Sequence, residues 1–483
     1  MGAGAATLVR PQRSPAADRR ADARLALVRD PLRAALFMLT VLTISRVHEN
    51  YPLLAKFRPA LLLVVASVGY AYLNPRFLTR ANVLRLWPTR LVVALGVIAC
   101  CSAAFGISLG GSASFILNSY SKTLAYTLLV ALSIRHVRDL YTFVWAYVVS
   151  CGILAFFSIF VFGITKASNS YVTRLNDLYT YDSNDLGVVL MVGLPLTLLL
   201  LSVERGARRL LLLLILIGIS VTMARSGSRG GFLGFAAVGV AALFLVRGVP
   251  AGKRLAVFAA AVIALLAGAP AGYWKQMATI LKPKEDYNYF DPDGRKAVME
   301  RGIGYTARYP VFGLGIDNFP RAECTISPKI DADGNGPVKC IAPHNSYVEA
   351  ASETGTVGFV VWVALVIGSI VAPLRLGRRL PRRWRRGTPA ERFLYAATSF
   401  FPVSMVGFAV TAFFVSFAWR DPIYLMASLL TGLHVSIRAQ LAEESQPSGT
   451  PATAPRAIRG SGWRVARSIW RADSWAHFQS GVR

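Results

Sequence analysis

The sequence predicts an all-α, polytopic membrane protein with about 12 transmembrane helices and one large, partly helical outer (periplasmic) loop. Composition is the first observation behind this class: 54% of the 483 residues are hydrophobic and 16% are charged, against roughly 25% charged in a typical soluble protein. The second is a series of long apolar runs, and the third is the concentration of basic residues between alternate runs. Together they argue against a soluble domain, a disordered chain and a secreted disulfide scaffold.

The predicted spans are apolar runs near the roughly 17–25 residues that a membrane-crossing helix needs. Two of them are weak: Ala34–Ser45 is short, and the span at about 117–134 carries Lys122. The run 91–121 is long enough to hold one span, a glycine-rich turn and the start of the next span. The charge-free runs are 59–75, 91–121, 140–165, 186–203, 210–224, 230–246, 255–274, 354–374, 393–419 and 422–437.

The net charge of +28 is distributed unevenly if the loops alternate from a cytoplasmic N-terminus. Lys and Arg then concentrate in the cytoplasmic segments, as the positive-inside rule of membrane proteins requires. This distribution removes most of the case for nucleic acid as a partner, and it makes anionic lipids the expected counter-charge. We therefore expect a multi-pass protein with both termini cytoplasmic.

Two helical blocks surround one large extramembrane segment in this organisation. The predicted segments are a basic tail (1–33), transmembrane helices 1–9 (34–270), the outer loop (271–353), transmembrane helices 10–12 (354–437) and a second basic tail (438–483).

The outer loop contains two cysteines and one motif that resembles a metal site. A disulfide between Cys324 and Cys340 is chemically allowed on an oxidising face, and two free thiols are the alternative. The stretch Asp331–Gly336 imitates the start of a calcium loop, but Ala342 stands where the bidentate Glu belongs. A polar turn is therefore favoured, and no metal site is predicted.

The first candidate site is the glycine-rich junction that contains Arg225 and Arg229, between two predicted spans. A helix begins at about Gly230, so free N–H groups, a helix dipole and two guanidinium groups meet there. This combination suits a phosphate or pyrophosphate. A basic turn that contacts lipid headgroups is an equally good explanation.

The second candidate is His344-Asn345, just before a helix that enters the membrane. A histidine that is neutral near pH 7 is a natural general base. Glu349 or Glu353 would orient the imidazole or pair with an arginine. The alternative is a helix-capping or merely exposed histidine.

The third candidate is a set of arginines near the predicted outer boundary, which would suit a polyanionic lipid-linked substrate. Pairing with acids of the loop is the alternative. Asn184 lies at the outer end of another span, where helix capping is a complete structural explanation. Arg420 and Asp421, in the last outer turn, are interpreted as a local ion pair. The arginines are Arg174, Arg295, Arg301 and Arg308.

These groups occur in an order that resembles the O-antigen polymerase/O-antigen ligase superfamily of bacterial inner-membrane glycosyltransferases. The resemblance covers roughly residues 170–375, and it comes from the order of short motifs and their shared side of the membrane. The motifs are Ser228-Arg229-Gly230, Arg295, Pro310…Gly313-Leu-Gly315…Asn318-Phe319 and His344-Asn345…Glu353-Thr-Gly355…Gly358.

The resemblance implies a metal-independent polysaccharide polymerase or O-antigen ligase in the bacterial inner membrane, with no cofactor. Such an enzyme moves an undecaprenyl-pyrophosphate-linked oligosaccharide onto a growing surface polysaccharide or lipid A-core at the outer face. The motifs do not separate polymerase from ligase, because acceptor choice depends on surface shape.

Residue by residue, the family's conserved arginine falls on Arg229, its loop histidine on His344 and its outer-loop arginine on Arg295. Its Arg…Asn pattern resembles Arg174…Asn184. The implied hypothesis is that these arginines, with Arg225 added, hold the donor pyrophosphate and stabilise the leaving group. His344 would accept the proton of the acceptor hydroxyl. The supporting residues are Asn345, Glu353 and Asn184.

A transporter or flippase of lipid-linked glycan is the main alternative, because it too would be polytopic and basic. Such a protein more often shows internal repeats, broken helices and charges near mid-membrane. Here the polar residues gather at the outer boundary, which favours an outer-face enzyme. A scaffold of an envelope complex is a third interpretation, for which the tails are the only argument.

Overall fold

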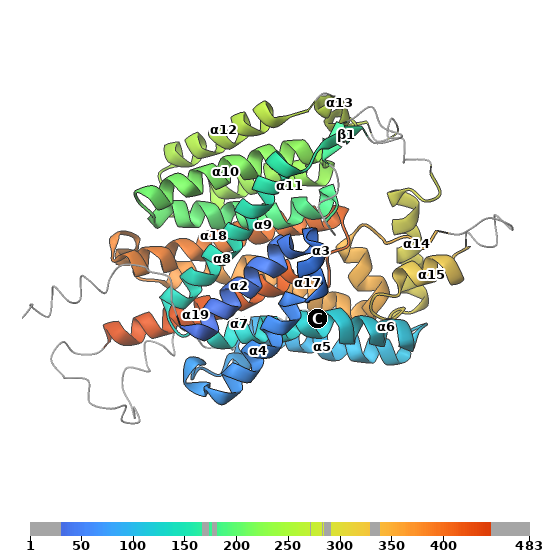
Figure 1. Cartoon of the computed structure of the whole chain (residues 1–483), viewed down its shortest axis with the longest axis horizontal. Coiled ribbons are helices and arrows are strands. Elements are labelled where there is room, and N and C mark those ends of the chain that lie inside the picture. Colours follow the sequence, from blue (N-terminus) through green and yellow to red (C-terminus); the bar gives the residue numbers. More distant parts are fainter. Residues whose placement is uncertain are drawn as a thin grey trace, which may run out of the picture.

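The computed structural model describes residues 30–166, 173–175, 181–270, 272–282, 284, 291–328 and 339–445. The predicted basic tails up to residue 29 and beyond residue 445, and the turn Asp331–Gly336, lie outside the described residues. The described chain is built almost entirely of helices that run roughly side by side (Figure 1). The all-α prediction is confirmed in this respect, and the long apolar helices fit a polytopic membrane protein.

The first part of the described chain ends in a small hairpin that the sequence did not predict. Strands β1 (Ile164–Lys166) and β2 (Thr173–Leu175) are antiparallel, with Thr165 opposite Arg174. The helices before it are α2 (Pro31–Ser45), η1 (Val47–Asn50), α3 (Pro52–Lys56), α4 (Pro59–Leu73), η2 (Pro75–Phe77), η3 (Val83–Arg85), α5 (Trp87–Phe105), α6 (Leu109–Phe115), η4 (Ile116–Tyr120), α7 (Ser121–Ser133), α8 (Val137–Phe156) and η5 (Phe157–Val161).

The second part contains four long helices, a group of short ones and a final set of long helices. They are α9 (Ser183–Val203), α10 (Ala207–Ser226), α11 (Arg229–Leu245), α12 (Ala251–Gly268), α13 (Tyr273–Ala278), α14 (Arg295–Arg308), α15 (Phe319–Thr325), α17 (Ser346–Arg379), η7 (Arg382–Arg386), α18 (Pro389–Thr411), η8 (Ala412–Phe414) and α19 (Asp421–Glu444).

Seven of the described helices are long and apolar enough to cross a membrane: α5, α8 with η5, α9, α10, α12, α17 and α18 with η8. The apolar helices α2, α4 and α11 have 15, 15 and 17 residues. At 1.5 Å per residue they are about 22–26 Å long, which is less than the roughly 30 Å of a bilayer core. Each predicted run coincides with a described helix, and the total of about 12 spans stays a prediction.

Helix α9 lies in the middle of the bundle. It packs against α8, α10, α11 and α18. In its most apolar stretch of 18 residues, 83% of the residues are buried. Its apolar residues surround the helix on every side, which is the pattern of a fully buried helix. Helix α12 is the opposite case, because only 11% of the residues in its most apolar stretch of 18 residues are buried. It packs against α10 and α11 at the edge of the bundle (Figure 1).

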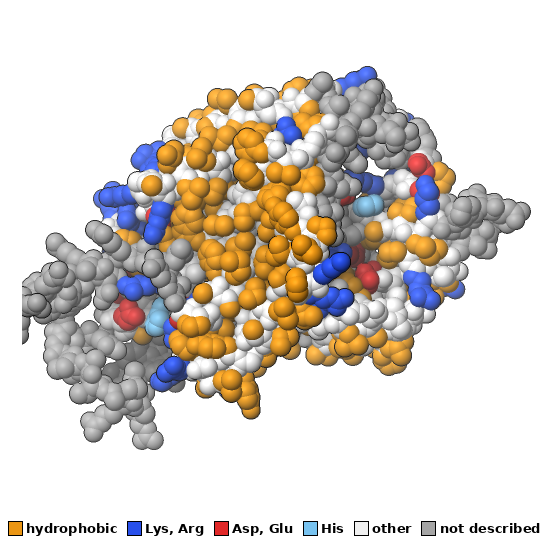
Figure 2. Space-filling view, in the orientation of Figure 1, with side chains coloured by type: hydrophobic (Ala, Val, Ile, Leu, Met, Phe, Trp, Pro, Cys, Tyr) orange, Lys and Arg blue, Asp and Glu red, His pale blue; other side chains and the backbone are white. Residues whose placement is uncertain are grey.

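The two ends of the bundle differ in the helices that begin there. Helices α9, α11 and α17 begin at the end that also carries α13, α14 and α15, which we call the site end (Figure 1). Helices α10, α12 and α18 begin at the opposite end. A broad band of hydrophobic side chains lies between the charged groups of the two ends (Figure 2). The predicted topology places the site end on the outer side of the membrane.

Candidate functional site

Side-chain hydrogen bonds join the first residues of α9 and α11 at the site end. Ser228, just before α11, accepts the N–H of Gly231 at 3.1 Å and donates its hydroxyl to Asn184 Oδ1 at 2.8 Å. Asp182, just before α9, accepts the N–H groups of Asn184 and Asp185 at 2.6 and 2.7 Å. Ser and Asp are favoured capping residues, so the local sequence starts both helices. Two helix N-termini, each with partial positive charge, therefore lie side by side.

Arg229 is the first residue of α11 and is half-buried. Its Nη1 donates to Thr279 Oγ1 at 2.9 Å, and this hydroxyl donates to the carbonyl of Gln276 at 2.7 Å. Gln276 Nε2 in turn donates to the carbonyl of Gly227 at 2.8 Å. Helix α13 and the turn after it therefore orient the Arg229 side chain at the N-terminus of α11.

His344 lies in the loop before α17, half-buried, and its N–H donates to Ser416 Oγ at 3.0 Å. Burial lowers the pKa of the imidazole below its ordinary value of 6.5, and the positive charge of Arg295 lowers it further, while Asp182 acts in the opposite direction. The loop histidine, the first residue of α14 and the cap of α9 therefore share one electrostatic neighbourhood. A lowered pKa keeps His344 neutral near pH 7, the state that a general base needs.

Asn345 is the cap of α17. Its Oδ1 accepts the N–H groups of Tyr347 and Val348 at 2.9 and 3.2 Å. This confirms that the helix starts directly after His344, and it gives Asn345 a structural role. The residue before this cap, His344, has a φ of +48°, which is in the left-handed region. A non-glycine residue in that region costs of order 1–3 kcal/mol, so the surrounding contacts determine the position of His344.

Glu353 is buried two turns into α17, and three N–H groups bond to its carboxylate. Oε2 accepts from the backbone of Asp317 at 2.8 Å and from Trp419 Nε1 at 2.8 Å. Oε1 accepts from the backbone of Phe319 at 3.1 Å. Glu353 thus holds the loop before α15 and the turn before α19 against α17. Its described contacts are with these segments and do not include His344.

The same loop enters a break in α17 at Gly355, whose φ is +67°. Leu314 N–H donates to the carbonyl of Ser352 at 2.8 Å, and Thr356 N–H donates to the carbonyl of Pro310 at 2.8 Å. A Cβ on Gly355 would lie 2.3 Å from the Val311 carbonyl oxygen. Two motifs of the resemblance, one around Gly313-Leu-Gly315 and one around Glu353-Thr-Gly355, are therefore contact partners.

Arg225 and Arg174 are placed differently from the other predicted arginines. Arg225 Nε donates to the carbonyl of Ser158 at 3.0 Å, and Nη2 donates to the carbonyl of Phe162 at 3.3 Å. These contacts tie α10 to η5 and to the residue that follows it. Arg174 lies on β2 opposite Thr165, and its side chain is outside the described part of the structure.

Arg301 pairs with an acid of the loop, which was the alternative to a role in substrate binding. Its guanidinium forms an ion pair with Glu323 on α15, and Nη1 donates to the carbonyl of Pro292 at 2.9 Å. The hydrogen bond to Glu323 raises the pKa of Arg301. Tyr305 also donates to Glu323, at 2.8 Å.

The guanidinium of Arg308 lies 5.6 Å from the ring centre of Tyr309.

Sequence reasoning missed two residues of this region, Asp182 and Arg420. The interpretation of Arg420 and Asp421 as a local ion pair was wrong, because the structure describes both side chains and they do not pair with each other. Asp421 instead accepts the hydroxyl of Thr123 at 2.7 Å, and the exposed Arg420 acts electrostatically on carboxyl groups of three other segments. These are Asp185, Asp317 and Glu349. The sequence shows one arginine and several acids in different outer turns. Their interaction could not be predicted, because it depends on how the fold brings these turns together.

The predicted residues that the structure brings into one neighbourhood are His344, Arg295 and Asn184, and Arg229 begins the helix whose cap, Ser228, bonds to Asn184. Asp182 connects them, because it caps the helix that carries Asn184 and its charge acts on His344. Figure 2 shows acidic, basic and histidine side chains near one another at the end that carries α14 and α15. Guanidinium groups and helix N-termini suit an anion, and a neutral imidazole beside them suits proton transfer. In the described part of the chain, no group of three or more His, Cys, Asp or Glu residues is placed to hold a metal ion.

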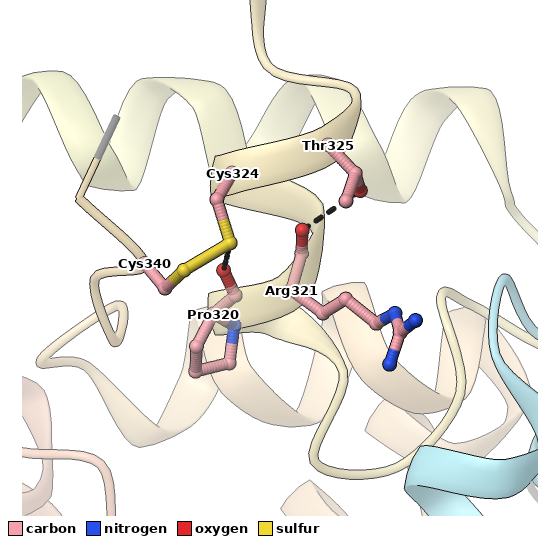
Figure 3. Close-up of a disulfide and its surroundings, with 5 residues drawn as sticks. All are labelled: Pro320, Arg321, Cys324, Thr325 and Cys340. Atoms are coloured by element: carbon pink, nitrogen blue, oxygen red, sulfur yellow. Dashed lines mark hydrogen bonds between the residues drawn. A yellow bond between two sulfur atoms is a disulfide. The ribbon is translucent and has the colours of Figure 1, made fainter. Parts of the chain in front are cut away.

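The structure joins Cys324, on α15, to Cys340 by a disulfide (Figure 3), with the two Cα atoms 5.0 Å apart. The bond ties α15 to the segment that leads to His344. Pro320 and Thr325 lie beside it, and the Thr325 hydroxyl donates to the carbonyl of Arg321 at 2.8 Å. Cys100, Cys101 and Cys151 are free thiols.

A sequence model of the O-antigen ligase family matches residues 210–363. The match runs from α10 into α17 and includes Arg225, Arg229, Arg295 and His344, whereas Arg174 and Asn184 lie before it. It confirms the predicted relation to the O-antigen ligase/polymerase superfamily. The family indicates a membrane glycosyltransferase-like role in polysaccharide or lipopolysaccharide assembly, with lipid-linked glycans as the general substrate class. No curated protein matches the chain.

Proposed function

We propose that this relative of the O-antigen ligases is a glycosyltransferase of the bacterial inner membrane. It moves an undecaprenyl-pyrophosphate-linked oligosaccharide onto a growing surface polysaccharide or onto lipid A-core at the outer face. The observation that carries the proposal is the electrostatic neighbourhood of His344, Arg295 and Asp182, together with its connection through Asn184 and Ser228 to α11.

In this proposal the donor pyrophosphate binds between Arg229 and Arg295, each the first residue of its helix. The guanidinium groups and the positive ends of the helix dipoles balance the phosphate charge. They act most strongly on the charge that develops as the leaving group departs, which is the requirement for catalysis. Arg174 and Arg225 remain proposed contributors, although the described hydrogen bonds of Arg225 go to backbone carbonyls.

His344 is the proposed general base. The acceptor hydroxyl oxygen attacks the anomeric carbon, the bond from that carbon to the pyrophosphate oxygen breaks, and the hydroxyl proton moves to the imidazole. Undecaprenyl pyrophosphate leaves with the bonding electron pair. A single displacement of this kind inverts the anomeric configuration, and fixed arginines supply the charge stabilisation for which other glycosyltransferases use a metal ion.

The break at Gly355 bears on the transporter alternative, because broken helices are a feature of transporters. Here the break receives the loop that contains Leu314, and backbone hydrogen bonds fill it. Its structural role is therefore to dock the loop. The disulfide supports the proposed outer position of the loop, since disulfides persist on oxidising faces.

The test uses purified protein in liposomes with an undecaprenyl-pyrophosphate oligosaccharide and no other enzyme. We expect release of undecaprenyl pyrophosphate and transfer of the glycan, to a second glycan for a polymerase or only to added lipid A-core for a ligase. His344→Ala should lower the rate by about 10²–10⁴-fold, the usual contribution of a general base. His48→Ala, which removes a histidine from the short helix η1 after α2, is the matched control and should keep the rate.

Each other outcome would count against the proposal. A His344→Ala rate equal to wild type would remove the proposed base. Movement of the lipid-linked glycan between leaflets, without release of undecaprenyl pyrophosphate under either acceptor, would favour the transporter.

A further inference from the structure

A cavity of about 420 Å³ lies toward the opposite end of the bundle, away from the residues of the candidate site. Residues of α9, α10, α11, α12 and α18 line it, and its walls are mostly aliphatic and aromatic side chains. Leu198, Leu213, Val238 and Phe258 are among them. The volume falls within the range of about 300–1,000 Å³ that is typical of small-ligand pockets. On one side the wall is α12, the least buried of the spanning helices (Figure 1).

Three basic side chains line the same cavity: Arg209, Lys253 and Arg254. No Asp or Glu is among the described residues that line it. Arg209 and Lys253 are exposed, and neither has an ion-pair partner among the described residues. The neighbouring Arg208 differs, because its Nη1 lies 3.8 Å from Glu204 Oε2. The cavity therefore combines apolar walls with a cationic mouth.

The position of these cations on their helices is electrostatically unfavourable without an anion. Arg209 is in the first turn of α10, and Lys253 and Arg254 are in the first turn of α12. The positive end of a helix dipole disfavours cations there and favours acidic residues, but neither first turn contains an acidic residue. Two helix N-termini and three cations thus lie at one cavity.

Arg254 shows how one of these charges is held. Its Nη1 donates to the carbonyls of Leu243 and Val246 at the end of α11, the latter at 3.0 Å. Its Nε is buried and has no hydrogen-bond partner within the described part of the chain. Carbonyl dipoles therefore orient the guanidinium, and no carboxylate among the described residues forms an ion pair with it.

We propose that this cavity is a binding site for an anionic phospholipid of the leaflet on the side opposite the candidate site. One acyl chain occupies the apolar cavity, and the phosphate binds Arg209 and Lys253. Basic pockets between transmembrane helices on the cytoplasmic side are known to bind anionic headgroups in this way. The positive-inside bias explains the sign of these residues, but it does not explain why they line an apolar cavity. The inference does not depend on the proposed glycosyl transfer.

The first experiment measures thermal unfolding of the purified full chain in detergent with added dioleoyl phosphatidylglycerol or dioleoyl phosphatidylcholine. We expect the anionic lipid to raise the unfolding temperature by about 3 °C or more at saturation, and the zwitterionic lipid to raise it much less. The double variant Arg209→Gln/Lys253→Gln loses two charge-assisted contacts. The phosphatidylglycerol concentration that gives half of the maximal rise in unfolding temperature should therefore increase about tenfold.

The matched control is Arg80→Gln/Arg85→Gln, which removes two exposed arginines near η3 at the same end of the bundle. It should keep the wild-type response. An equal rise with both lipids, or an equal loss in both double variants, would overturn the proposal, because either result would mean general lipid solvation or general basicity.

A second experiment separates the acyl chain from the headgroup. Ala242 lines the cavity, and Ala242→Leu should fill part of it and reduce the phosphatidylglycerol retained by the protein in native mass spectrometry by about half or more. Glycerol 3-phosphate should give no comparable rise in unfolding temperature. Unchanged retention in Ala242→Leu, or full stabilisation by glycerol 3-phosphate, would show that the cavity is not where the lipid binds. A polyprenyl phosphate that stabilises wild type alone, without any effect of phosphatidylglycerol, would also reject the proposed ligand.

Discussion

The two ends of the helical bundle gather the same kinds of groups in different surroundings. Each end gathers helix N-termini and basic side chains: Arg229 and Arg295 at the site end, Arg209 and Lys253 at the opposite end. At the site end Arg295 acts electrostatically on His344, and the carboxylate of Asp182 acts on the same imidazole. At the opposite end they lie at an apolar cavity with no acidic residue among its described lining. The difference shows that positive charge alone does not define a site, because the neighbouring groups decide what the charge can do.

The mechanical support of the two ends also differs. The site end is built on α9, which is buried on all sides, and on α17, whose first turns are held by Glu353 and Asn345. The cavity has the peripheral α12 as one of its walls. Rigid elements hold catalytic groups to the tolerances that reaction geometry requires, whereas an edge helix suits contact with lipid.

The largest effect in this comparison is expected for Arg229→Lys. A lysine keeps the charge but cannot reproduce bidentate contact with phosphate, so kcat/KM for glycan transfer should fall about 10- to 100-fold. The stabilisation by phosphatidylglycerol should stay at its wild-type value, since the change is at the other end. Arg321→Lys, an exposed arginine on α15, serves as the control and should retain transfer. Full activity of the Arg229→Lys protein would contradict the pyrophosphate role.

A smaller effect, on stability, is expected for Glu353→Gln. The glutamine amide has one oxygen in place of two, so at least one of the three N–H donors that face Glu353 loses its acceptor. An unpaired buried donor costs about 1–3 kcal/mol, and the free energy of unfolding in denaturant should fall by that amount. Glu300→Gln, on an exposed ion pair with Lys296, should change it by less than about 0.5 kcal/mol. Equal effects of the two changes would remove the structural role of Glu353.

The smallest effect is expected for Arg295→Gln, and it concerns the pH dependence of kcat/KM. Neutral His344 is the proposed base, so kcat/KM should fall as pH decreases through its pKa, which burial and Arg295 hold below the ordinary 6.5. Without the positive charge this pKa rises, and the acidic limb of the pH profile moves to higher pH, by less than about one unit. Arg295→Lys keeps the charge and should keep the limb in place. A limb that does not move in Arg295→Gln, or that moves equally in both variants, would separate Arg295 from the titration of His344.

Local signals carried much of the prediction. Apolar runs predicted where the helices are, and the order of short motifs predicted the O-antigen ligase/polymerase relation that the match over 210–363 confirms. That His344 and Arg295 influence each other was expected from the motifs and not from any spacing in the chain. The contact of Gly313-Leu-Gly315 with Glu353-Thr-Gly355 could not be predicted, because it depends on a break in α17 that the apolar pattern does not show.

The sequence by itself determined the helical class and the places where α11 and α17 begin, because hydrophobicity and capping act over a few residues. Only the tertiary structure decided what the charged residues face. The Arg225 guanidinium donates to backbone carbonyls of η5 and of the residue after it, and Arg420 acts on acids of other segments. Electrostatic partners are set by distances between segments that lie far apart in the chain, and those distances exist only once the helices have packed.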